Sequence, residues 1–156
     1  MKKIVLFDID YTLFDTDEFK KSNLTVFKLY EEAESVLEEL IQSCEVGIFS
    51  EGKDEFQREK LRQTLIHGRF QEKNIHIFLS KDDNIESVLQ KHRGDDVFLV
   101  DDKLAVLSLA KNLDNNTFVI WVKRGPFAMN EENNQGFVPD ATVSNLSEII
   151  PLILGY

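Results

Sequence analysis

The chain has 156 residues, of which 42% are hydrophobic, and a formal net charge of −10 at pH 7. A chain of this length is expected to form one domain, residues 1–156, with a core large enough to be stable. The negative charge disfavours partners such as nucleic acid or an anionic membrane. The single cysteine, Cys44, excludes an internal disulfide, and no apolar run approaches the ~18 residues of a membrane span. We therefore expect a cytoplasmic protein that does not enter the membrane.

Apolar runs rich in β-branched residues alternate along the chain with stretches of helical periodicity. The apolar runs predict strands at residues 4–7, 46–49, 75–79, 97–100 and 118–122. The periodic stretches predict helices at residues 31–43, 54–67, 84–91 and 103–112. Continuously apolar strands that alternate with helices are typical of a parallel sheet with helices on both faces. The predicted fold class is therefore α/β, a doubly wound, Rossmann-like parallel sheet of about five core strands.

Two stretches between these elements lack a clear period. Residues 14–30 carry mixed charge and predict a loop with a short helix, a flap or minimal cap beside the first strand. Residues 123–140 contain turn formers, among them the pair Gly125 and Pro126, and predict a long surface loop. Residues 142–154 then predict a short strand and a last helix.

Side chains that can cap helices precede three of the predicted helices. Asp54 is the candidate N-cap of the predicted helix at residues 54–67. Asp82 or Asp83 is the candidate N-cap of the predicted helix at residues 84–91. The last helix has Asn145 or Ser147 in the capping position.

Polar side chains stand where four of the predicted strands end. The first strand is followed by Asp8, Asp10 and Thr12, the second by Ser50, the third by Lys81, and the fourth by Asp101 and Asp102. The carboxyl ends of parallel strands lie at one edge of a sheet, which is where such folds bind ligands. We therefore expect carboxylates, hydroxyls and an ammonium group to converge at that edge.

This set of groups suits phosphoryl transfer. A carboxylate can attack phosphorus and form an aspartyl-phosphate, while a second acid protonates the leaving oxygen and then deprotonates water. Mg²⁺ prefers carboxylate oxygens and removes the repulsion between an anionic nucleophile and the phosphate. A hydroxyl and a lysine can hold the remaining phosphoryl oxygens.

The motifs, in this order, resemble those of the haloacid dehalogenase-like phosphatase superfamily. The first motif of that superfamily, Asp-x-Asp-x-Thr after a hydrophobic strand, matches residues 8–12. The second, a Ser or Thr that ends the next core strand, matches Ser50, and the third, a Lys, matches Lys81. The fourth, an acidic pair after a strand, matches Asp101 and Asp102. The resemblance covers nearly the whole chain.

The resemblance implies a role for each matching residue. Asp8 would be the catalytic nucleophile, and Asp10 the general acid and base. Thr12, Ser50 and Lys81 would bind the phosphoryl group of the substrate, and Thr12 would also support the loop.

A metal site is implied by the same resemblance. The Mg²⁺ ligands would be Asp8, the backbone carbonyl of Asp10, and the pair Asp101 and Asp102, with Asp102 the more direct contributor of the pair.

Some basic residues leave alternatives open. Lys53, Lys73 and Lys103 compete with Lys81 for the place of the phosphate-binding lysine. Arg124 follows the fifth predicted strand and either touches the substrate or has a surface role.

Members of this superfamily often carry a cap domain inserted after the first or second motif. Here only 42 positions separate Asp8 from Ser50, and the predicted helix at residues 31–43 takes up much of that interval. The resemblance therefore implies a member without a sizeable cap domain and with an open site.

The function expected from the sequence is a Mg²⁺-dependent phosphomonoesterase that acts on a small phosphorylated metabolite. A phosphatase for a phosphoprotein or a nucleic-acid end is the alternative, because an open site suits a large substrate. A non-catalytic module is the third interpretation, either a phospho-acceptor like a response-regulator receiver or a scaffold of similar fold. A homo-oligomer in which a neighbouring subunit covers the site is compatible with each.

Overall fold

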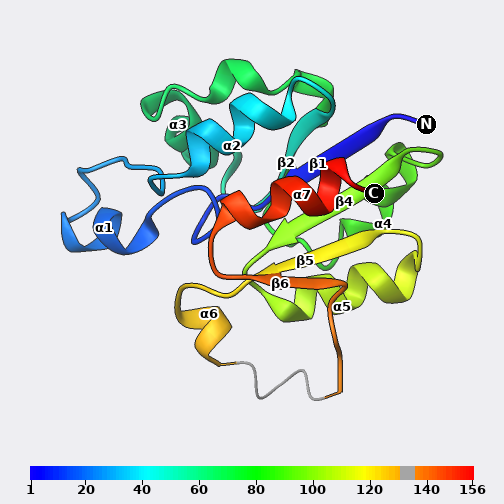
Figure 1. Cartoon of the computed structure of the whole chain (residues 1–156). Helices are drawn as coiled ribbons and strands as arrows, with labels where there is room; N and C mark the ends of the chain where they lie inside the picture. The colour runs from blue at the N-terminus through cyan, green and yellow to red at the C-terminus, as the bar shows by residue number, and fades with distance from the viewer. Residues whose placement is uncertain (131–135) are drawn as a thin grey trace.

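Six parallel strands form one sheet in the order β3-β2-β1-β4-β5-β6 (Figure 1). The structure is a computed structural model that describes residues 1–130 and 136–156. The strands are β1 (Lys3–Phe7), β2 (Glu45–Glu51), β3 (Ile75–Phe78), β4 (Asp96–Asp101), β5 (Phe118–Val122) and β6 (Ala141–Val143). The doubly wound α/β fold predicted from the sequence is confirmed, and the short strand predicted after the fifth forms the sixth, at the edge.

The central position of β1 follows from its composition. Ile4, Val5, Leu6 and Phe7 are all fully buried, so both faces of this strand need a cover of apolar side chains. The chain winds outward from β1 to β3 and then returns to place β4 on the other side of β1. The strand order therefore changes direction between β1 and β4, which is where open α/β sheets bind ligands. In the flavodoxin-like order of the receivers, β3 would lie beside β1, so this sheet is not of that type.

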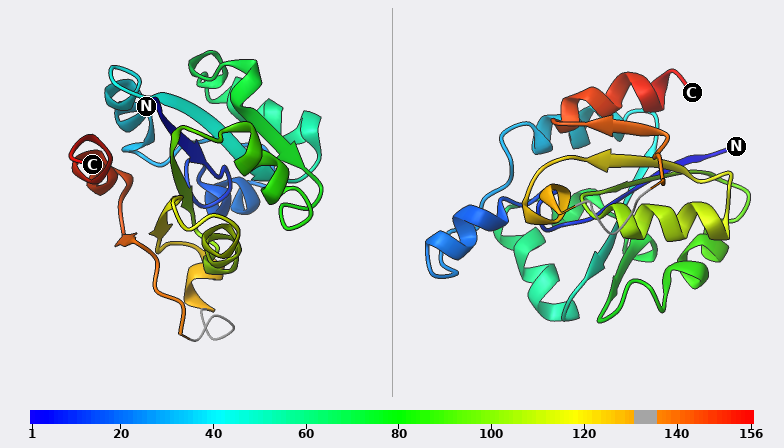
Figure 2. Two further views of the ribbon diagram at one scale, coloured as in Figure 1. Left: turned by 90° about the vertical axis from the view of Figure 1, so that its right-hand side faces the viewer. Right: turned by 90° about the horizontal axis from the view of Figure 1, so that it is seen from below.

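Seven helices flank the sheet in the described residues. They are α1 (Thr16–Lys21), α2 (Ala33–Leu40), α3 (Asp54–Gln63), α4 (Ile85–Lys91), α5 (Leu104–Leu113), α6 (Pro126–Met129) and α7 (Ile149–Leu154). The buried residues of α2 and α7 share one core cluster with Val5 and Phe7, while those of α4 and α5 share another with Ile4 and Leu6. Helices lie on both faces of the sheet (Figure 2). Alternate side chains of β1 therefore belong to opposite layers, as the pleat of a strand requires.

Two of the predicted helix caps are wrong. Asp54 is the first residue of α3 and not its N-cap, because its carboxylate accepts a hydrogen bond from Arg58 Nε at 3.0 Å, one turn further on. Neither Asp82 nor Asp83 caps α4, since the backbone carbonyl of Lys81 accepts the first N–H groups there. The backbone thereby satisfies the donors that a side-chain cap would otherwise take.

The predicted cap at the other end of the chain is confirmed. Asn145 accepts a hydrogen bond from the Ser147 N–H, and Glu148 reaches back to the Asn145 N–H at 2.8 Å. This capping box begins a 3-10 turn that leads directly into α7.

The predicted loop at residues 123–140 is wrong in part. Pro126 opens the short helix α6, and Gly125 precedes it with a φ of 82°, a conformation that favours glycine. Residues 131–135 of the predicted loop lie outside the described residues. The short helix expected within residues 14–30 is confirmed as α1, which Asp15 caps through the Glu18 N–H.

Within residues 1–130 and 136–156, no helix combines the length with the hydropathy needed to cross a membrane.

The close packing of β2 against the segment before β3 gives a test of the fold. A Cβ atom at Gly47 would lie 2.6 Å from the backbone oxygen of Asn74 and 2.8 Å from Leu6 Cδ2. We therefore expect Gly47→Ala to lower the free energy of unfolding by about 1–3 kcal/mol, because backbone must move to make room. Urea unfolding measures this. Gly68→Ala is the control, since a Cβ atom there meets nothing within 4 Å; equal effects of both changes would contradict the packing described.

The buried imidazoles of His76 and His92 predict how stability depends on pH. Their Nε2 atoms lie 2.9 Å apart, so one ring holds a hydrogen that the other accepts. Burial, reinforced by His92, lowers the pKa of His76 to about 4 from its ordinary 6.5. The unfolded chain takes up this proton first as the pH falls, so stability is full above pH 6.5 and decreases towards pH 4.

Urea unfolding of the wild type and of His76→Gln at pH 7.5, 6.0 and 5.0 tests this. The variant is expected to lose less stability than the wild type between pH 7.5 and 5.0, because it lacks one proton acceptor in the unfolded state. Parallel curves for the two proteins would show that the imidazole pair is not responsible.

Candidate active site

The groups predicted at the strand ends meet at one edge of the sheet. Asp8 directly follows β1, Asp101 ends β4, and Asp102 comes next. Lys81 lies three residues after β3, and Ser50 lies near the carboxyl end of β2. Because the four strands are parallel neighbours, their carboxyl ends lie together, as the sequence predicted.

Lys81 joins two of the carboxylates. Its Nζ donates to Asp8 Oδ1 at 2.8 Å and to Asp101 Oδ2 at 2.6 Å, and all three side chains are buried. Burial works against the charged form of Lys81, but Asp101 and Asp8 raise its pKa above the ordinary value. Of the competing lysines, Lys73 pairs with Glu45 and Lys103 with Glu51. Lys81 is therefore the lysine that contacts the predicted nucleophile.

Asp8, Asp101 and Asp102 form a buried acidic cluster in which one ligand oxygen of each lies within 4.8 Å of the others. Both oxygens of Asp101 are already engaged, one by Lys81 and the other by the Lys103 N–H at 2.9 Å. Both oxygens of Asp102 are buried and have no hydrogen-bond partner among the described residues. Asp102 therefore contributes the free oxygens of the cluster.

The pKa values of the cluster reflect this crowding. Burial, opposed by Lys81, raises the pKa of Asp8 to about 6. Burial, followed by repulsion from Asp8 and Asp101, raises the pKa of Asp102 to about 11. In the absence of a cation, the cluster is thus destabilised in its fully ionised form.

The cluster fits a divalent cation. The ammonium of Lys81 pairs with two of the three carboxylates, Asp8 and Asp101, which leaves two negative charges in excess when all three are ionised. The oxygens of Asp102, which have no hydrogen-bond partner among the described residues, would become ligands of the ion. Carboxylate oxygens are the ligands that hard cations such as Mg²⁺ prefer.

Asp10 lies beside the cluster but faces a different set of partners. Its carboxylate accepts hydrogen bonds from Lys60 Nζ at 2.8 Å, Gln57 Nε2 at 3.0 Å and Thr16 Oγ1 at 3.0 Å. Gln57 also donates to Ser50 Oγ at 2.7 Å, so one amide connects two predicted site residues.

Lys60 and Gln57 were not among the site residues predicted from the sequence. Both lie on the buried side of α3 with Leu61, at the spacing of one helical turn. Polar side chains on the inner stripe of a helix that follows a predicted site strand are the signal that could have identified them.

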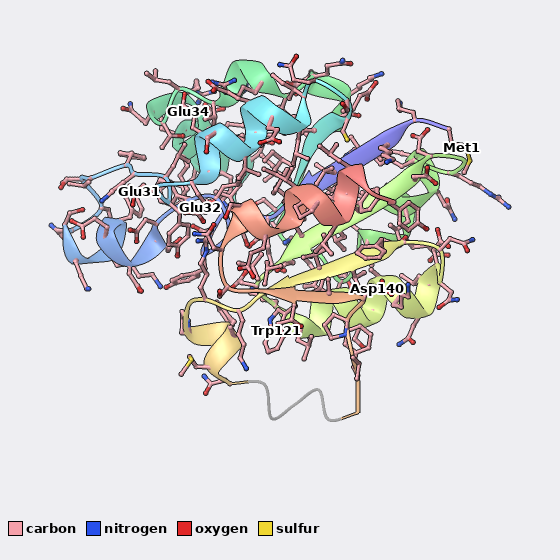
Figure 3. The ribbon with its side chains drawn as sticks, viewed as in Figure 1. Met1, Glu31, Glu32, Glu34, Trp121 and Asp140 are labelled. Atoms are coloured by element: carbon pink, nitrogen blue, oxygen red, sulfur yellow. The ribbon has the colours of Figure 1, made fainter. Side chains whose placement is uncertain are left out.

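Thr12 and Ser50 lie behind the carboxylates. Both are fully buried, and the Thr12 hydroxyl donates to Asp8 Oδ2 at a long 3.4 Å. Arg124 donates to the Thr12 carbonyl and pairs with Glu32 at 2.5 Å (Glu32 is labelled in Figure 3). This contact is neither of the two roles left open for Arg124, because Arg124 Nη2 bonds the loop that carries Asp8 and Asp10 and so braces it.

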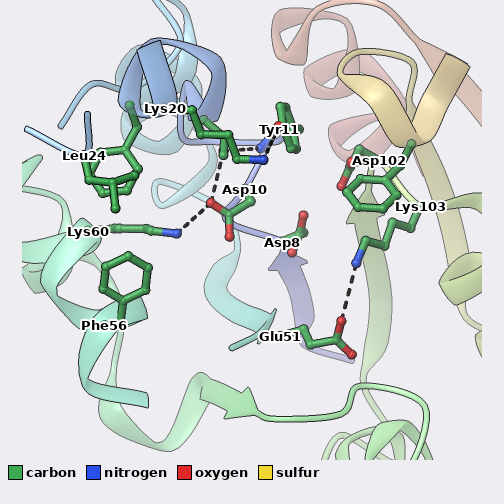
Figure 4. A pocket seen from close by; sticks show the side chains of 13 residues that line it. Asp8, Asp10, Tyr11, Lys20, Leu24, Glu51, Phe56, Lys60, Asp102 and Lys103 are labelled. Carbon is green, nitrogen blue, oxygen red and sulfur yellow. Dashed lines mark hydrogen bonds and ion pairs between the residues drawn. The ribbon is translucent and has the colours of Figure 1, made fainter. Parts of the chain in front are cut away.

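A cavity of about 350 Å³ opens beside these carboxylates (Figure 4). Its floor carries Asp8, Asp10 and Asp102. Its walls include four aromatic rings and three lysines: Tyr11, Phe19, Phe56, Phe127, Lys20, Lys60 and Lys103. Small-molecule sites in proteins begin at about this size.

Solved structures of low sequence identity share this fold. A protein described as a haloacid dehalogenase-like hydrolase, from Burkholderia xenovorans, matches with a TM-score of 0.82 at 17% identity, over 99% of this chain and 97% of its own. The chain has the haloacid dehalogenase-like fold. One described as a phosphatase, from Clostridium difficile, matches with a TM-score of 0.75 at 20% identity, over 97% and 98%. A haloacid dehalogenase-type hydrolase from Bacillus subtilis, bound to magnesium, matches with a TM-score of 0.71 at 11% identity, over 97% and 98%.

No protein-family model matches the sequence, and neither does any curated protein. Identities this low establish the haloacid dehalogenase-like fold and leave the activity to be argued from the site. No cap domain lies between β1 and β3 in the described part of the chain, where only α1, α2, α3 and two 3-10 turns accompany β2.

The acidic cluster gives a test that does not depend on activity. Mg²⁺ is expected to raise the melting temperature of the wild type by a few degrees, because the ion offsets the repulsion among three buried carboxylates. Asp102→Asn is expected to raise the melting temperature without Mg²⁺ and to abolish the further rise with it. Differential scanning calorimetry with and without chelator measures both.

The exposed residue Asp82 supplies the control for this test, since Asp82→Asn removes the same charge outside the cluster. A wild type that ignores Mg²⁺, or an Asp102→Asn variant that still responds like the wild type, would contradict the assignment of a cation site.

Proposed function

We propose that this protein is a Mg²⁺-dependent phosphomonoesterase in which Asp8 accepts the phosphoryl group. The observation that carries the proposal is the buried cluster of Asp8, Asp101 and Asp102, in which Lys81 pairs with Asp8 and Asp101. A buried site with excess negative charge suits a divalent cation, and an anionic substrate such as a phosphate can approach Asp8 only when that charge is neutralised.

Asp8 and Asp102, with Asp101 and the backbone carbonyl of Asp10, would hold the ion. When bound, Mg²⁺ would neutralise the excess charge of the cluster and polarise the phosphoryl group. Asp102 suits direct contact better than Asp101, because only Asp102 has oxygens without hydrogen-bond partners in the described structure.

The reaction then proceeds in two displacements. A carboxylate oxygen of Asp8 attacks phosphorus, the bond between phosphorus and the ester oxygen breaks, and Asp10 gives its proton to the leaving oxygen. Water then attacks the phosphorus of the aspartyl-phosphate while Asp10 takes one proton from it. Phosphate leaves, and both carboxyl groups return to their starting states.

The contacts of Asp10 suit this double role. Lys60, Gln57 and Thr16 hold its carboxylate in one position, and its side chain lines the cavity and stays 29% exposed. A fixed acid that still reaches solvent can exchange protons with both the leaving group and water.

Lys81 and Ser50 retain donors for the phosphoryl oxygens. An ammonium has three donors, and Lys81 uses two of them on Asp8 and Asp101. Ser50 accepts from Gln57 and keeps its own hydroxyl hydrogen. Thr12 directs its hydroxyl to Asp8, so its role is to support the nucleophile and its loop.

The substrate we propose is a small phosphorylated metabolite. A cavity of about 350 Å³ suits a ligand of that size better than it suits a macromolecular substrate. A phosphoprotein or nucleic-acid end is the alternative, and the net charge of −10 weakens the latter. We place the reaction in the cytoplasm, with the chain acting alone or as a homo-oligomer.

Hydrolysis of an aryl phosphate tests the proposal. The wild type is expected to release phosphate with Mg²⁺ and to stop with chelator. Asp8→Asn is expected to lose at least about 10³-fold in kcat, because it removes the nucleophile, and Asp10→Asn at least about 10²-fold, because it removes the proton donor. Steady-state release of phenolate measures both.

Asp82→Asn is the matched control, and wild-type rates are expected for it. Turnover that survives Asp8→Asn would refute the mechanism. A folded, Mg²⁺-binding wild type with no turnover on any phosphomonoester would favour the non-catalytic interpretation instead.

A further inference from the structure

Two half-exposed phenylalanines line the cavity beside the acidic cluster. Phe56 from α3 and Phe127 from α6 keep 45% and 49% of their surface exposed. Tyr11, three residues after the nucleophile Asp8, also lines the cavity but is buried. Aromatic rings that stay exposed to water next to the carboxylates offer a surface to which an apolar ligand can bind.

Phe127 is fixed in place despite its exposure. Its ring packs edge-on against Tyr11, with 6.2 Å between the two ring centroids. Lys103 Nζ also lies over the Phe127 ring, 4.3 Å from its centroid. Gly125 allows this arrangement, since a Cβ atom there would lie 2.6 Å from the Tyr11 ring. The wall formed by α6 is therefore built onto the loop that carries the nucleophile.

Phe56 is fixed from the other direction. Its ring lies 6.1 Å from that of Phe19 and 4.7 Å from Lys60 Nζ, which in turn pairs with Asp10. Leu24 completes this wall, and Figure 4 shows Leu24 and Phe56 together on the Lys60 side of Asp10. Rings held by neighbours lose little freedom when a ligand stacks on them.

The backbone of this cavity is strained at two of the lining residues. Tyr11 and Leu24 have φ angles of 61° and 64°, a region that side-chain-bearing residues rarely adopt. The φ of Leu24 belongs to the end of α1, where its N–H bonds the Phe19 carbonyl at 2.8 Å, and its side chain stays 53% exposed beside the cavity. The strained conformation of Tyr11 lies next to Asp10, and strain of this kind clusters at active sites.

We propose that the cavity is a leaving-group subsite for phosphomonoesters whose alcohol or phenol carries an aromatic ring. The inference rests on the proposed phosphatase function and adds the substrate class. With the phosphoryl group at Asp8, a ring attached to the leaving oxygen extends into a space bounded by Phe56, Phe127 and Leu24. Phe56 and Phe127 are the specificity-determining residues, and neither takes part in the chemistry.

An aliphatic polyol gains less from these walls. Sugar and glycerol hydroxyl groups require hydrogen-bond partners, and Phe56, Phe127 and Leu24 have none to offer. All three lysines of the cavity are directed to partners of their own, Lys60 to Asp10, Lys103 to Glu51, and Lys20 to the Tyr11 hydroxyl. The cavity therefore discriminates in favour of flat apolar groups.

Binding of phosphonates, which cannot turn over, tests the subsite directly. Titration calorimetry with Mg²⁺ compares benzylphosphonate with methylphosphonate. The wild type is expected to bind the benzyl compound about tenfold or more tightly, a preference that Phe56→Ala and Phe127→Ala each reduce about fivefold. Phe56→Leu, which keeps the apolar volume without the ring, tests the aromatic contact if the alanine variant is poorly folded.

Leu113→Ala is the control, because Leu113 is also partly exposed but lies at the opposite edge of the sheet, before β5. It is expected to keep the full preference. A wild type without a preference, a preference that survives both phenylalanine changes, or a failure to bind either phosphonate would overturn the subsite. Turnover of aryl phosphate that requires Asp8 is measured separately. The proposed phosphatase function is therefore tested independently of the subsite.

Discussion

The burial of three acidic side chains beside one ammonium is the constraint on which this structure depends. Asp8, Asp101 and Asp102 would repel one another if all were ionised, and Lys81, which pairs with Asp8 and Asp101, would offset only part of that repulsion, so the pKa values of Asp8 and Asp102 are raised. A fold optimised for stability alone would replace such a cluster with apolar side chains. The sheet must therefore be rigid enough to hold the carboxylates together, and the six parallel strands with apolar cores on both faces provide that rigidity.

The same topology explains why the sequence could predict so much of the site. Strand ends are local features, marked by an apolar run that stops at a polar residue, and parallel strands bring all such ends to one edge. Asp8, Lys81 and Asp101 could therefore be placed together before any distance was known. The five core strands were predictable for a similar reason, since their apolar runs are short and rich in β-branched residues, which favours strands over helices.

Features that depend on contacts across the fold could not be predicted in this way. Asp54 is a good helix cap in isolation, but its ion pair with Arg58 takes up the carboxylate. Lys60 and Gln57 read as ordinary helical residues, and only the packing of α3 shows that they reach Asp10. The wall at α6 depends on the absence of a side chain at Gly125, whose consequence appears only when Tyr11 lies against it.

Residues at the strand ends and residues of the cavity walls have different roles in the candidate site. The strand ends supply the charged groups, and they are held by the sheet, so their geometry changes little with the surrounding loops. The cavity walls come from α1, α3 and α6, which follow the strands and are tied to the floor through side-chain contacts such as Lys60 with Asp10 and Tyr11 with Phe127. On the function proposed above, we expect substitutions in these walls to alter which leaving group fits while the carboxylates stay in place. With no cap domain in the described part of the chain, such walls are where we expect discrimination between substrates to arise.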